Sequence, residues 1–178
     1  PVTVGLPFPR GVVSDPASLT LRDACGRQLF LQSQPLSRWS DGSVRWMLLD
    51  FQASVNANAH GLFQIQTRSG QRKECQAPCL SIQESNRQIV INTRKATFVL
   101  NRQLCKPFDR VCLAGVDLIA GDGSSFRLTD ELGREYFPHI HDLAVETTGP
   151  LRATVRARGE LKAGSGFGLT HFVARLSF

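Results

Sequence analysis

The chain has 178 residues, of which 42% are hydrophobic and 20% charged, and its net charge at neutral pH is +6. This length is enough to bury a real core, in one large or two small domains. No run approaches the roughly 18 apolar residues of a membrane span, and the start lacks the pattern of a signal peptide, so we expect no membrane partner.

Short strand-like runs fill the first seventy residues, with Gly and Pro turns between them. They predict about six strands in a small β-barrel or sandwich, because no window keeps a helical period. The segment Gly5–Gly11 holds two prolines and two glycines, which predicts a rigid, extended loop. The predicted strands are Val2–Val4, Ser18–Arg22, Gln28–Gln32, Leu36–Trp39, Val44–Ala53 and His60–Thr67.

The central feature of this half is a predicted hairpin at Asp41-Gly42, since that dipeptide readily adopts the positive φ angles of a tight turn. It joins the strands Leu36–Trp39 and Val44–Ala53. Arg38, Asp41 and Arg45 are polar exceptions near the turn, and the simplest interpretation is a charged tip kept in water.

The second strand of the hairpin is apolar on both sides. Trp46 and Leu48 point one way, and Met47, Leu49 and Phe51 point the other. We therefore expect this strand to lie deep in a core, at the centre of the first domain.

Residues 69–78 are polar and charged without an apolar pattern, so we predict a linker between a barrel at 1–68 and a β-sandwich at 79–178. The whole chain is predicted to be all-β, and the later strands to be long and antiparallel. The predicted strands are Leu80–Gln83, Gln88–Asn92, Ala96–Leu100, Val111–Ala114, Val116–Ile119, Phe126–Thr129, Ile140–Thr147, Leu151–Gly159 and Phe167–Phe178. The chain starts without Met and ends inside an apolar run, so we expect a truncated sandwich from a longer protein.

Three arginines form a basic ladder in the run LRATVRARG, because Arg152, Arg156 and Arg158 share one face of an extended strand. Guanidinium groups at this pitch suit the carboxylates of an acidic polymer. The alternative is an ordinary solvated sheet face, with the arginines paired to acids on neighbouring strands.

Two histidine arrangements are candidate sites. His139 and His141 share a strand face in PHIHD, while Asp142 is predicted to face the other way. His171 and Arg175 share one face of the last strand, which would place a base beside a cation. Ordinary histidines held by their neighbours are the alternative, because a metal site needs further ligands that these patterns do not supply.

The five cysteines, Cys25, Cys75, Cys79, Cys105 and Cys112, are odd in number and irregular in spacing, which predicts free thiols. Cys75 and Cys79 lack a matching downstream pair, so we predict no metal and no cofactor. The basic residues are scattered and lack interleaved aromatics, so we expect no nucleic-acid partner. Positive charge in general favours acidic partners, among them polyanionic glycans. No common catalytic motif is present.

A resemblance to the amino-terminal region of the exo-rhamnogalacturonan lyase family is carried by VGLPFPRGVV, LTLRDACGRQL and above all QPLSRWSDGSVRWMLLDFQA. The matching residues are Gly5, Pro7, Phe8, Pro9 and Gly11, then Arg38, Trp39, Asp41, Gly42, Ser43, Val44, Arg45 and Trp46. The resemblance implies a RIFT-type barrel, then a central β-sandwich, then a helical α/α toroid that this chain lacks. Fainter similarity continues through IVINTRKATFVLNR and VETTGPLRATVRARGEL.

Such lyases cleave the uronate–rhamnose backbone of pectin by β-elimination, in which a base removes the C5 proton while a cation neutralises the carboxylate. The catalytic residues are unknown here, and Arg38, Asp41 and Arg45 transfer only as motif residues of unknown role. The leading hypothesis is a scaffold portion of a lyase that is inactive alone, periplasmic or extracellular from the implied substrate. The alternatives are a stand-alone carbohydrate-binding or adhesion module, or a small enzyme that uses the histidines.

Overall fold

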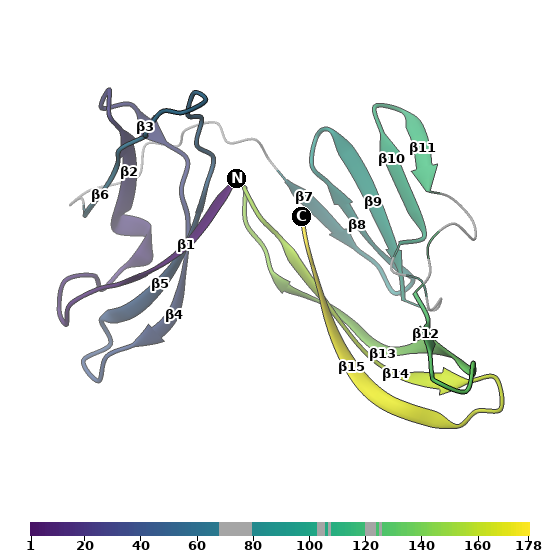
Figure 1. Cartoon of the computed structure of the whole chain (residues 1–178). Helices are drawn as coiled ribbons and strands as arrows, with labels where there is room; N and C mark the ends of the chain where they lie inside the picture. Colours follow the sequence, from purple (N-terminus) through teal and green to yellow (C-terminus); the bar gives the residue numbers. More distant parts are fainter. Residues whose placement is uncertain (68–79, 103–105, 107, 120–123, 125) are drawn as a thin grey trace. The chain divides into compact units, whose positions relative to one another are not determined.

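The computed structural model describes residues 1–67, 80–102, 106, 108–119, 124 and 126–178, which form two compact units, Pro1–Ala77 and Pro78–Phe178 (Figure 1). Their regular structure is β-strand apart from one turn of 3₁₀ helix, so the predicted all-β class is confirmed. The predicted linker lies outside the described residues. No helix among the described segments is long and apolar enough to cross a membrane.

Unit 1 consists of two three-stranded antiparallel sheets, in the orders β1-β5-β4 and β3-β2-β6. Turns rich in Gly, Asp and Pro separate its strands, as the sequence predicted. The elements are β1 Val2–Pro7, η1 Pro16–Ser18, β2 Leu19–Asp23, β3 Gln28–Leu29, β4 Gln32–Arg38, β5 Val44–Phe51 and β6 Phe63–Thr67.

The core of unit 1 lies between these two sheets. Alternate residues of β5 and β2 point into it, as the two-residue period of a strand requires. Its buried members are Val13, Leu19, Leu21, Leu31, Val44, Met47, Leu49 and Phe51. Because both sheets contribute, neither could bury its apolar side alone.

Two predictions about unit 1 were wrong in detail. The central strand β5 is not fully buried on both faces, because on its outer face Trp46 is 42% exposed and Leu48 half-buried, while Asp50 is buried. Gly5–Pro7 belongs to β1 rather than to a loop, and pairs with Trp46–Leu48 of β5. Pro7 is tolerated there because β1 is an edge strand and the missing N–H faces away from the ladder.

Unit 2 is built from a five-stranded sheet in the order β11-β10-β9-β8-β7 and a four-stranded sheet in the order β12-β13-β14-β15, both antiparallel. The first sheet contains β7 Ser81–Glu84, β8 Gln88–Asn92, β9 Ala96–Asn101, β10 Arg110–Leu113 and β11 Val116–Ile119. The second contains β12 Leu128–Thr129, β13 Glu135–Thr147, β14 Thr154–Ala163 and β15 Gly168–Ser177.

The two sheets of unit 2 share one hydrophobic core. Ile89, Ile91 and Leu100 come from the five-stranded sheet, and Leu143, Val155 and Ala157 from the four-stranded sheet. Phe98, Phe108 and Phe178 pack against this core and against one another. The alternation of LRATVRARG is thereby explained, because its small apolar residues face inward and its arginines face out.

A β-bulge in β13 changes which side chains share a face. His139 pairs with Glu160 and Ile140 with Gly159, but the next paired residue is Asp142, opposite Arg158. His141 is the extra residue, so alternation restarts and Asp142 points outward. The prediction that Asp142 faces away from the histidines was therefore wrong, because a single extra residue inverts the faces that follow it.

Gly159 permits the close packing of strands at this bulge. A Cβ atom there would lie 2.3 Å from the carbonyl oxygen of His139 and 2.7 Å from the ring of Phe172. Both contacts are shorter than any side chain tolerates. The glycine therefore fixes how β13 and β15 approach β14, and with it the position of His139.

Candidate functional site

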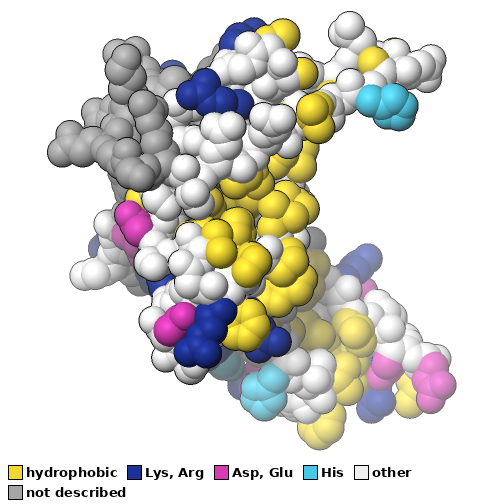
Figure 2. All heavy atoms as spheres, turned by 90° about the vertical axis from the view of Figure 1, so that its left-hand side faces the viewer, with side chains coloured by type: hydrophobic (Ala, Val, Ile, Leu, Met, Phe, Trp, Pro, Cys, Tyr) yellow, Lys and Arg dark blue, Asp and Glu magenta, His cyan; other side chains and the backbone are white. Residues whose placement is uncertain are grey.

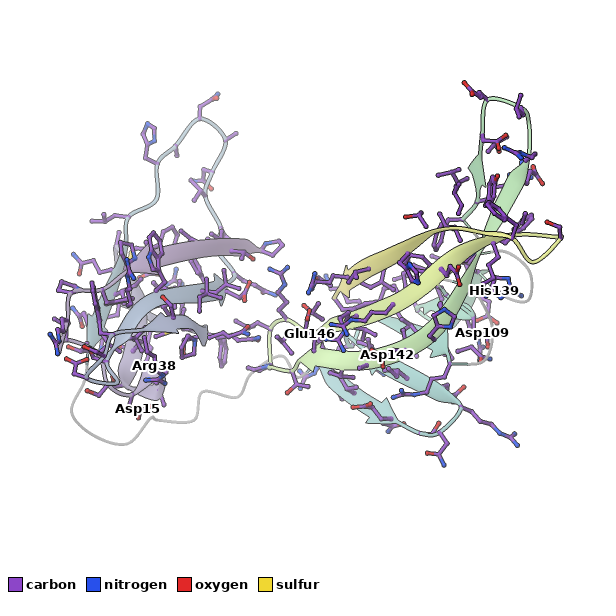
Figure 3. The ribbon with its side chains drawn as sticks, turned by 90° about the horizontal axis from the view of Figure 1, so that it is seen from below. Asp15, Arg38, Asp109, His139, Asp142 and Glu146 are labelled. Carbon is purple, nitrogen blue, oxygen red and sulfur yellow. The ribbon has the colours of Figure 1, made fainter. Side chains whose placement is uncertain are left out.

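Charged and imidazole side chains gather on the outward side of β13, β14 and β15, which we call the polar face. His139, Asp142 and Glu146 follow one another along β13 (Figure 3). Cross-strand pairing places Arg156 opposite Arg175, and Glu160 opposite both His139 and His171. The full set is His139, His141, Asp142, Glu146, Arg156, Arg158, Glu160, Lys162, His171 and Arg175.

One half of the polar face is a network of ion pairs. Both carboxylate oxygens of Glu146 accept hydrogen bonds from Arg175, at 2.6 Å from Nε and 3.0 Å from Nη2. Arg156 donates to Asp142 at 3.0 Å and lies 3.8 Å from Glu146. Hydrogen bonding by Arg175 lowers the pKa of Glu146. Arg156 and Arg175 are thus held by carboxylates of β13.

Arg158 differs from its neighbours on the polar face. Its side chain makes no hydrogen bond and no ion pair with any residue that the structure describes, although its charge contributes to the lowered pKa of Glu146. Its side chain is exposed in the middle of the sheet, between Asp142 on β13 and Val173 on β15. A guanidinium in this position is able to donate hydrogen bonds to a ligand carboxylate without breaking an existing ion pair.

The other half of the polar face is organised around Glu160. Its carboxylate oxygen lies 3.1 Å from Nζ of Lys162 and 3.9 Å from Nε2 of His141. The hydrogen bond from Lys162 lowers the pKa of Glu160, and the charges of Lys162, His171 and His141 act in the same direction. A Cβ atom on Gly168 would lie 1.9 Å from the Glu160 carboxylate. Gly168 therefore leaves the space that Glu160 occupies.

Arg152 lies at the end of the sheet. Its guanidinium donates a hydrogen bond of 3.1 Å to the hydroxyl of Ser177, which in turn is hydrogen-bonded to Thr154. It is therefore held by the β14–β15 pair at some distance along the strand from Arg158, with Arg156 between them.

The described residues contain no group of three or more His, Cys, Asp or Glu side chains arranged to hold a metal ion. Cys25 is an exposed free thiol and Cys112 a half-buried one. Cys75, Cys79 and Cys105 lie outside the described residues.

The motif residues of unit 1 form a second charged group, at the β4–β5 hairpin. Asp41 accepts hydrogen bonds from the backbone and hydroxyl of Ser43, at 3.0 and 2.6 Å, and pairs with Arg10 at 3.0 Å. The Ser43 hydroxyl also accepts the N–H of Gly11 at 2.9 Å. We call Arg10, Gly11, Asp41 and Ser43 the hairpin cluster. It fastens the opening segment to the hairpin, and the hydrogen bonds from Ser43 lower the pKa of Asp41.

The other two motif arginines also contact unit 1 itself. Arg38 donates to the carbonyl oxygens of Gly42 at 2.7 Å and Ser14 at 3.4 Å, beside Asp15 (Figure 3). The Arg45 guanidinium lies 4.9 Å from the centre of the Trp39 ring, in a cation–π arrangement. Trp39 in turn donates its indole N–H to the carbonyl of Phe8 at 3.1 Å.

An apolar surface accompanies these residues on unit 1. Trp46 is 42% exposed and Leu36 is 55% exposed. The edge of the Trp46 ring lies 4.0 Å from where a Cβ atom of Gly5 would be, so the ring lies over the backbone of β1. Figure 2 shows hydrophobic side chains gathered in a band on the side of unit 1 that faces the viewer, with basic side chains above and below it.

Four residues that matter to these groups were absent from the sequence-based candidates, namely Arg10, Glu146, Glu160 and Lys162. Glu160 and Lys162 continue the outward alternation of Arg156 and Arg158 beyond Gly159, so extending the strand by four residues would have found them. Arg10 was missed because nothing in its local sequence indicates that it pairs with Asp41, which lies 31 positions away.

Comparison with known proteins gives an independent indication of what unit 1 is. Residues 1–68 match the family model of the PcRGLX-like N-terminal RIFT barrel domain. The expected RIFT-type barrel, and the resemblance to the N-terminal region of the rhamnogalacturonan lyase family, are confirmed for this segment.

Similarity to a curated bacterial protein extends over most of the chain. The uncharacterized protein YetA of Bacillus subtilis (strain 168) is 23% identical over 169 residues. The alignment covers 89% of this chain but 19% of that protein. The chain thus spans about a fifth of the length of this relative.

Proposed function

We propose that this chain is the non-catalytic, β-rich N-terminal portion of a rhamnogalacturonan-degrading polysaccharide lyase. It acts as a scaffold for the rest of the enzyme, and its polar face contributes contacts to an acidic glycan. The observation that carries the proposal is the match of residues 1–68 to the PcRGLX-like N-terminal RIFT barrel domain, which associates the chain with a lyase-like family.

The chemistry of the polar face supports an acidic ligand. Its cations, Arg156, Arg158, Lys162 and Arg175, outnumber its carboxylates, Asp142, Glu146 and Glu160. Arginine suits uronate recognition because its planar fork binds a carboxylate through two parallel hydrogen bonds. Arg158 is the residue expected to make the first contact, because its neighbours Arg156 and Arg175 are already paired.

The scaffold role is supported by exposed apolar side chains at one end of the four-stranded sheet. Strand pairing brings together the β12 end, the start of β13 and the β14–β15 turn. Between 38% and 64% of each side chain is exposed at Phe126, Leu128, Phe137, Phe167 and Leu169. Exposed apolar groups on both sides of this end of the sheet, with Phe137 opposite Lys162 and Leu128 opposite Tyr136, favour a protein contact, which we assign to the helical toroid domain of the parent enzyme.

A lack of catalysis by this chain alone is supported by the setting of its histidines. β-Elimination requires a base and a carboxylate-neutralising cation held around one sugar ring, in a site that excludes water. His139, His141 and His171 instead lie at exposed positions on an open sheet face. They suit contact with a polymer surface better than proton abstraction at a single carbon.

The proposal is tested by mixing the purified chain with rhamnogalacturonan and following both the absorbance of the unsaturated uronate product and the binding isotherm. A neutral galactan of similar length serves as the control ligand. The proposal expects binding of rhamnogalacturonan without product. Product formation would contradict the non-catalytic assignment, and the absence of binding would contradict the glycan contact.

A second candidate function is a stand-alone carbohydrate-binding or adhesion module, which the exposed Trp46 favours. An exposed indole ring on a flat sheet face offers an apolar surface for one side of a sugar ring. Under this alternative, Trp46→Ala abolishes binding to neutral and acidic glycans alike, whereas Arg158→Ala has little effect. The leading proposal expects the reverse order.

A further inference from the structure

One edge of the four-stranded sheet in unit 2 is open. β15 is the outermost strand in the order β12-β13-β14-β15, and no strand among the described residues pairs with its far side. It is ten residues long, Gly168–Ser177, and it pairs with β14 without a register shift from Thr170 to Ser177. A long strand edge presents a row of backbone N–H and C=O groups that are able to pair with another chain.

The other sheet edges within the described residues are protected in ways that β15 is not. The edge strand β1 contains Pro7, and β4 contains Pro35 and has two register shifts in its pairing with β5. The edge strands β3 and β12 have two residues each, β7 and β11 have four each, and β6 has five. Proline, bulges and short length all hinder pairing at an edge. From Thr170 to Ser177, β15 has none of these.

The ladder between β14 and β15 identifies which backbone groups face the open edge. Phe178 and Ala153 exchange two backbone hydrogen bonds, of 2.9 and 3.2 Å, directly before β14 begins. Since hydrogen-bonded pairs alternate along an antiparallel ladder, the even-numbered residues of β15 bond to β14. The N–H and C=O groups of His171, Val173 and Arg175 therefore point to the open edge.

We propose that β15 is a self-association edge, at which two copies of this chain pair antiparallel about a two-fold axis at Val173. This pairing places Val173 opposite its counterpart and His171 opposite Arg175 of the second copy. Edge N–H groups then meet edge C=O groups along the strand. Because the side chains of these three residues point outward, the pairing joins the polar faces of two copies into one surface.

The inward side chains of β15 permit this register. Phe172 lies opposite Ala174 of the second copy, so a large residue meets a small one. The Phe172 ring leans over β14, where a Cβ atom of Gly159 would lie 2.7 Å from it, and its centre lies 5.4 Å from that of Phe126. The ring is thus turned away from the edge. An axis at Phe172 would instead set two bulky rings opposite each other, which favours the axis at Val173.

The outward side chains of β15 also permit self-pairing. Arg175 is the only Lys, Arg, Asp or Glu in the strand, and it is held by Glu146 through hydrogen bonds of 2.6 and 3.0 Å. Val173 is 55% exposed, so apolar surface is buried at the centre of the pair. Because one strand from each copy makes a smaller interface than the standard one of about 1,600 Å², we expect a dimer that dissociates on dilution.

The test is sedimentation equilibrium of the whole chain from about 5 µM to about 500 µM, the range in which a weak interface dissociates. Val173→Pro removes the N–H at the centre of the edge and takes no donor from the β14 ladder. Val173→Thr is the matched control, because it keeps the N–H and the β-branched shape. Circular dichroism melting verifies that each variant folds.

Amide hydrogen exchange of the natural chain is a second measurement, which depends on no variant. The amides of His171, Val173 and Arg175 are expected to exchange about tenfold more slowly where about nine tenths of the chain is dimeric than in dilute solution. The amides of Phe172 and Ala174 are protected by β14 at both concentrations. If Val173→Pro unfolds, this measurement decides.

The result expected is a concentration-dependent dimer for the natural chain and Val173→Thr. Association of Val173→Pro is expected to be at least about tenfold weaker, because each copy loses a central hydrogen bond. A chain that stays monomeric at all these concentrations would overturn the inference. So would a dimer that Val173→Pro leaves intact, or slow exchange of the edge amides in the monomer, since the chain itself would then cover the edge. No glycan takes part, so the outcome is separate from the function proposed above.

Discussion

Charged side chains at the β4–β5 hairpin of unit 1 bond to the backbone, to Ser43 and to Arg10 of the opening segment, whereas most of those on the polar face of unit 2 bond to one another across strands. Asp41 is held by Ser43 and by Arg10 from the opening segment. On the polar face, Arg156 and Arg175 are held by acids of β13, and Arg158 remains unpaired among the described residues. A charged sequence motif therefore serves local folding in one unit, while a plain alternating strand provides the ligand-accessible cation in the other.

The largest expected effect is on the stability of unit 1. Ser43 is 3% exposed, and its hydroxyl both donates to Asp41 and accepts from Gly11. Ser43→Ala removes both bonds and leaves a backbone N–H without its partner, which is expected to cost about 1–3 kcal/mol. Urea unfolding followed by tryptophan fluorescence measures this in unit 1 alone, because both tryptophans, Trp39 and Trp46, lie there.

The matched control for this prediction is Ser40→Ala, an exposed serine in the same turn. It is expected to change stability by less than about 0.5 kcal/mol. Equal effects of the two substitutions would show that the hairpin cluster does not hold the opening segment in place.

The second largest expected effect is on the stability of unit 1 in acid, through the carboxylate of Asp41. Since the pKa of Asp41 is lower in the folded chain than its ordinary value of 3.8, its contribution to stability is complete above about pH 4. That contribution is lost as the pH falls through the lowered value. Asp41→Asn is expected to reduce the stability of unit 1 at neutral pH and to flatten the loss of stability on acidification, as followed by tryptophan fluorescence from pH 7 downward.

One result of the same titration would contradict a stabilising role for Asp41. If the natural chain and Asp41→Asn lose stability in parallel below about pH 4, the carboxylate of Asp41 gains nothing from Ser43 and Arg10 in the folded state. Asp41 would then serve some purpose other than the stability of unit 1.

Much of the fold could be predicted because it depends on local patterns. The hairpin strands flank the Asp41-Gly42 turn as expected, but only Gly42 has the predicted positive φ angle and Asp41 does not. The inward residues of β14 followed from alternation alone. What escaped prediction was the bulge at His141, because an extra residue in a ladder leaves no mark in a hydrophobic pattern.

The candidate groups were less predictable than the strands. Alternation placed Arg156, Arg158, His171 and Arg175 on outward positions, but their partners lie on other strands whose register is not visible in sequence. The exposure of Trp46 was missed because an apolar residue predicts burial on average, and only the finished sheet shows which of its two faces is covered.

A smaller effect is expected from changing the ion-pair network of the polar face. Glu146→Gln removes a carboxylate that holds Arg175 and also attracts Arg156. The freed guanidinium groups are expected to tighten binding of rhamnogalacturonan about two- to threefold, with a steeper dependence on salt. Isothermal titration at two salt concentrations measures both quantities.

The control for that measurement is Glu131→Gln, which removes an exposed acid in the β12–β13 turn and leaves the polar face intact. Weaker binding by Glu146→Gln would mean that Glu146 orients the arginines for the ligand rather than competing with it.

The central claim, that the polar face of unit 2 rather than the charged hairpin of unit 1 contacts an acidic glycan, is tested most directly by one paired titration. Arg158→Ala and Arg45→Ala each remove an exposed arginine that has no carboxylate partner among the described residues. With rhamnogalacturonan as ligand, we predict at least about fivefold weaker binding for Arg158→Ala and an unchanged affinity for Arg45→Ala. Unchanged binding by Arg158→Ala together with a loss in Arg45→Ala would contradict it and assign the contact to unit 1.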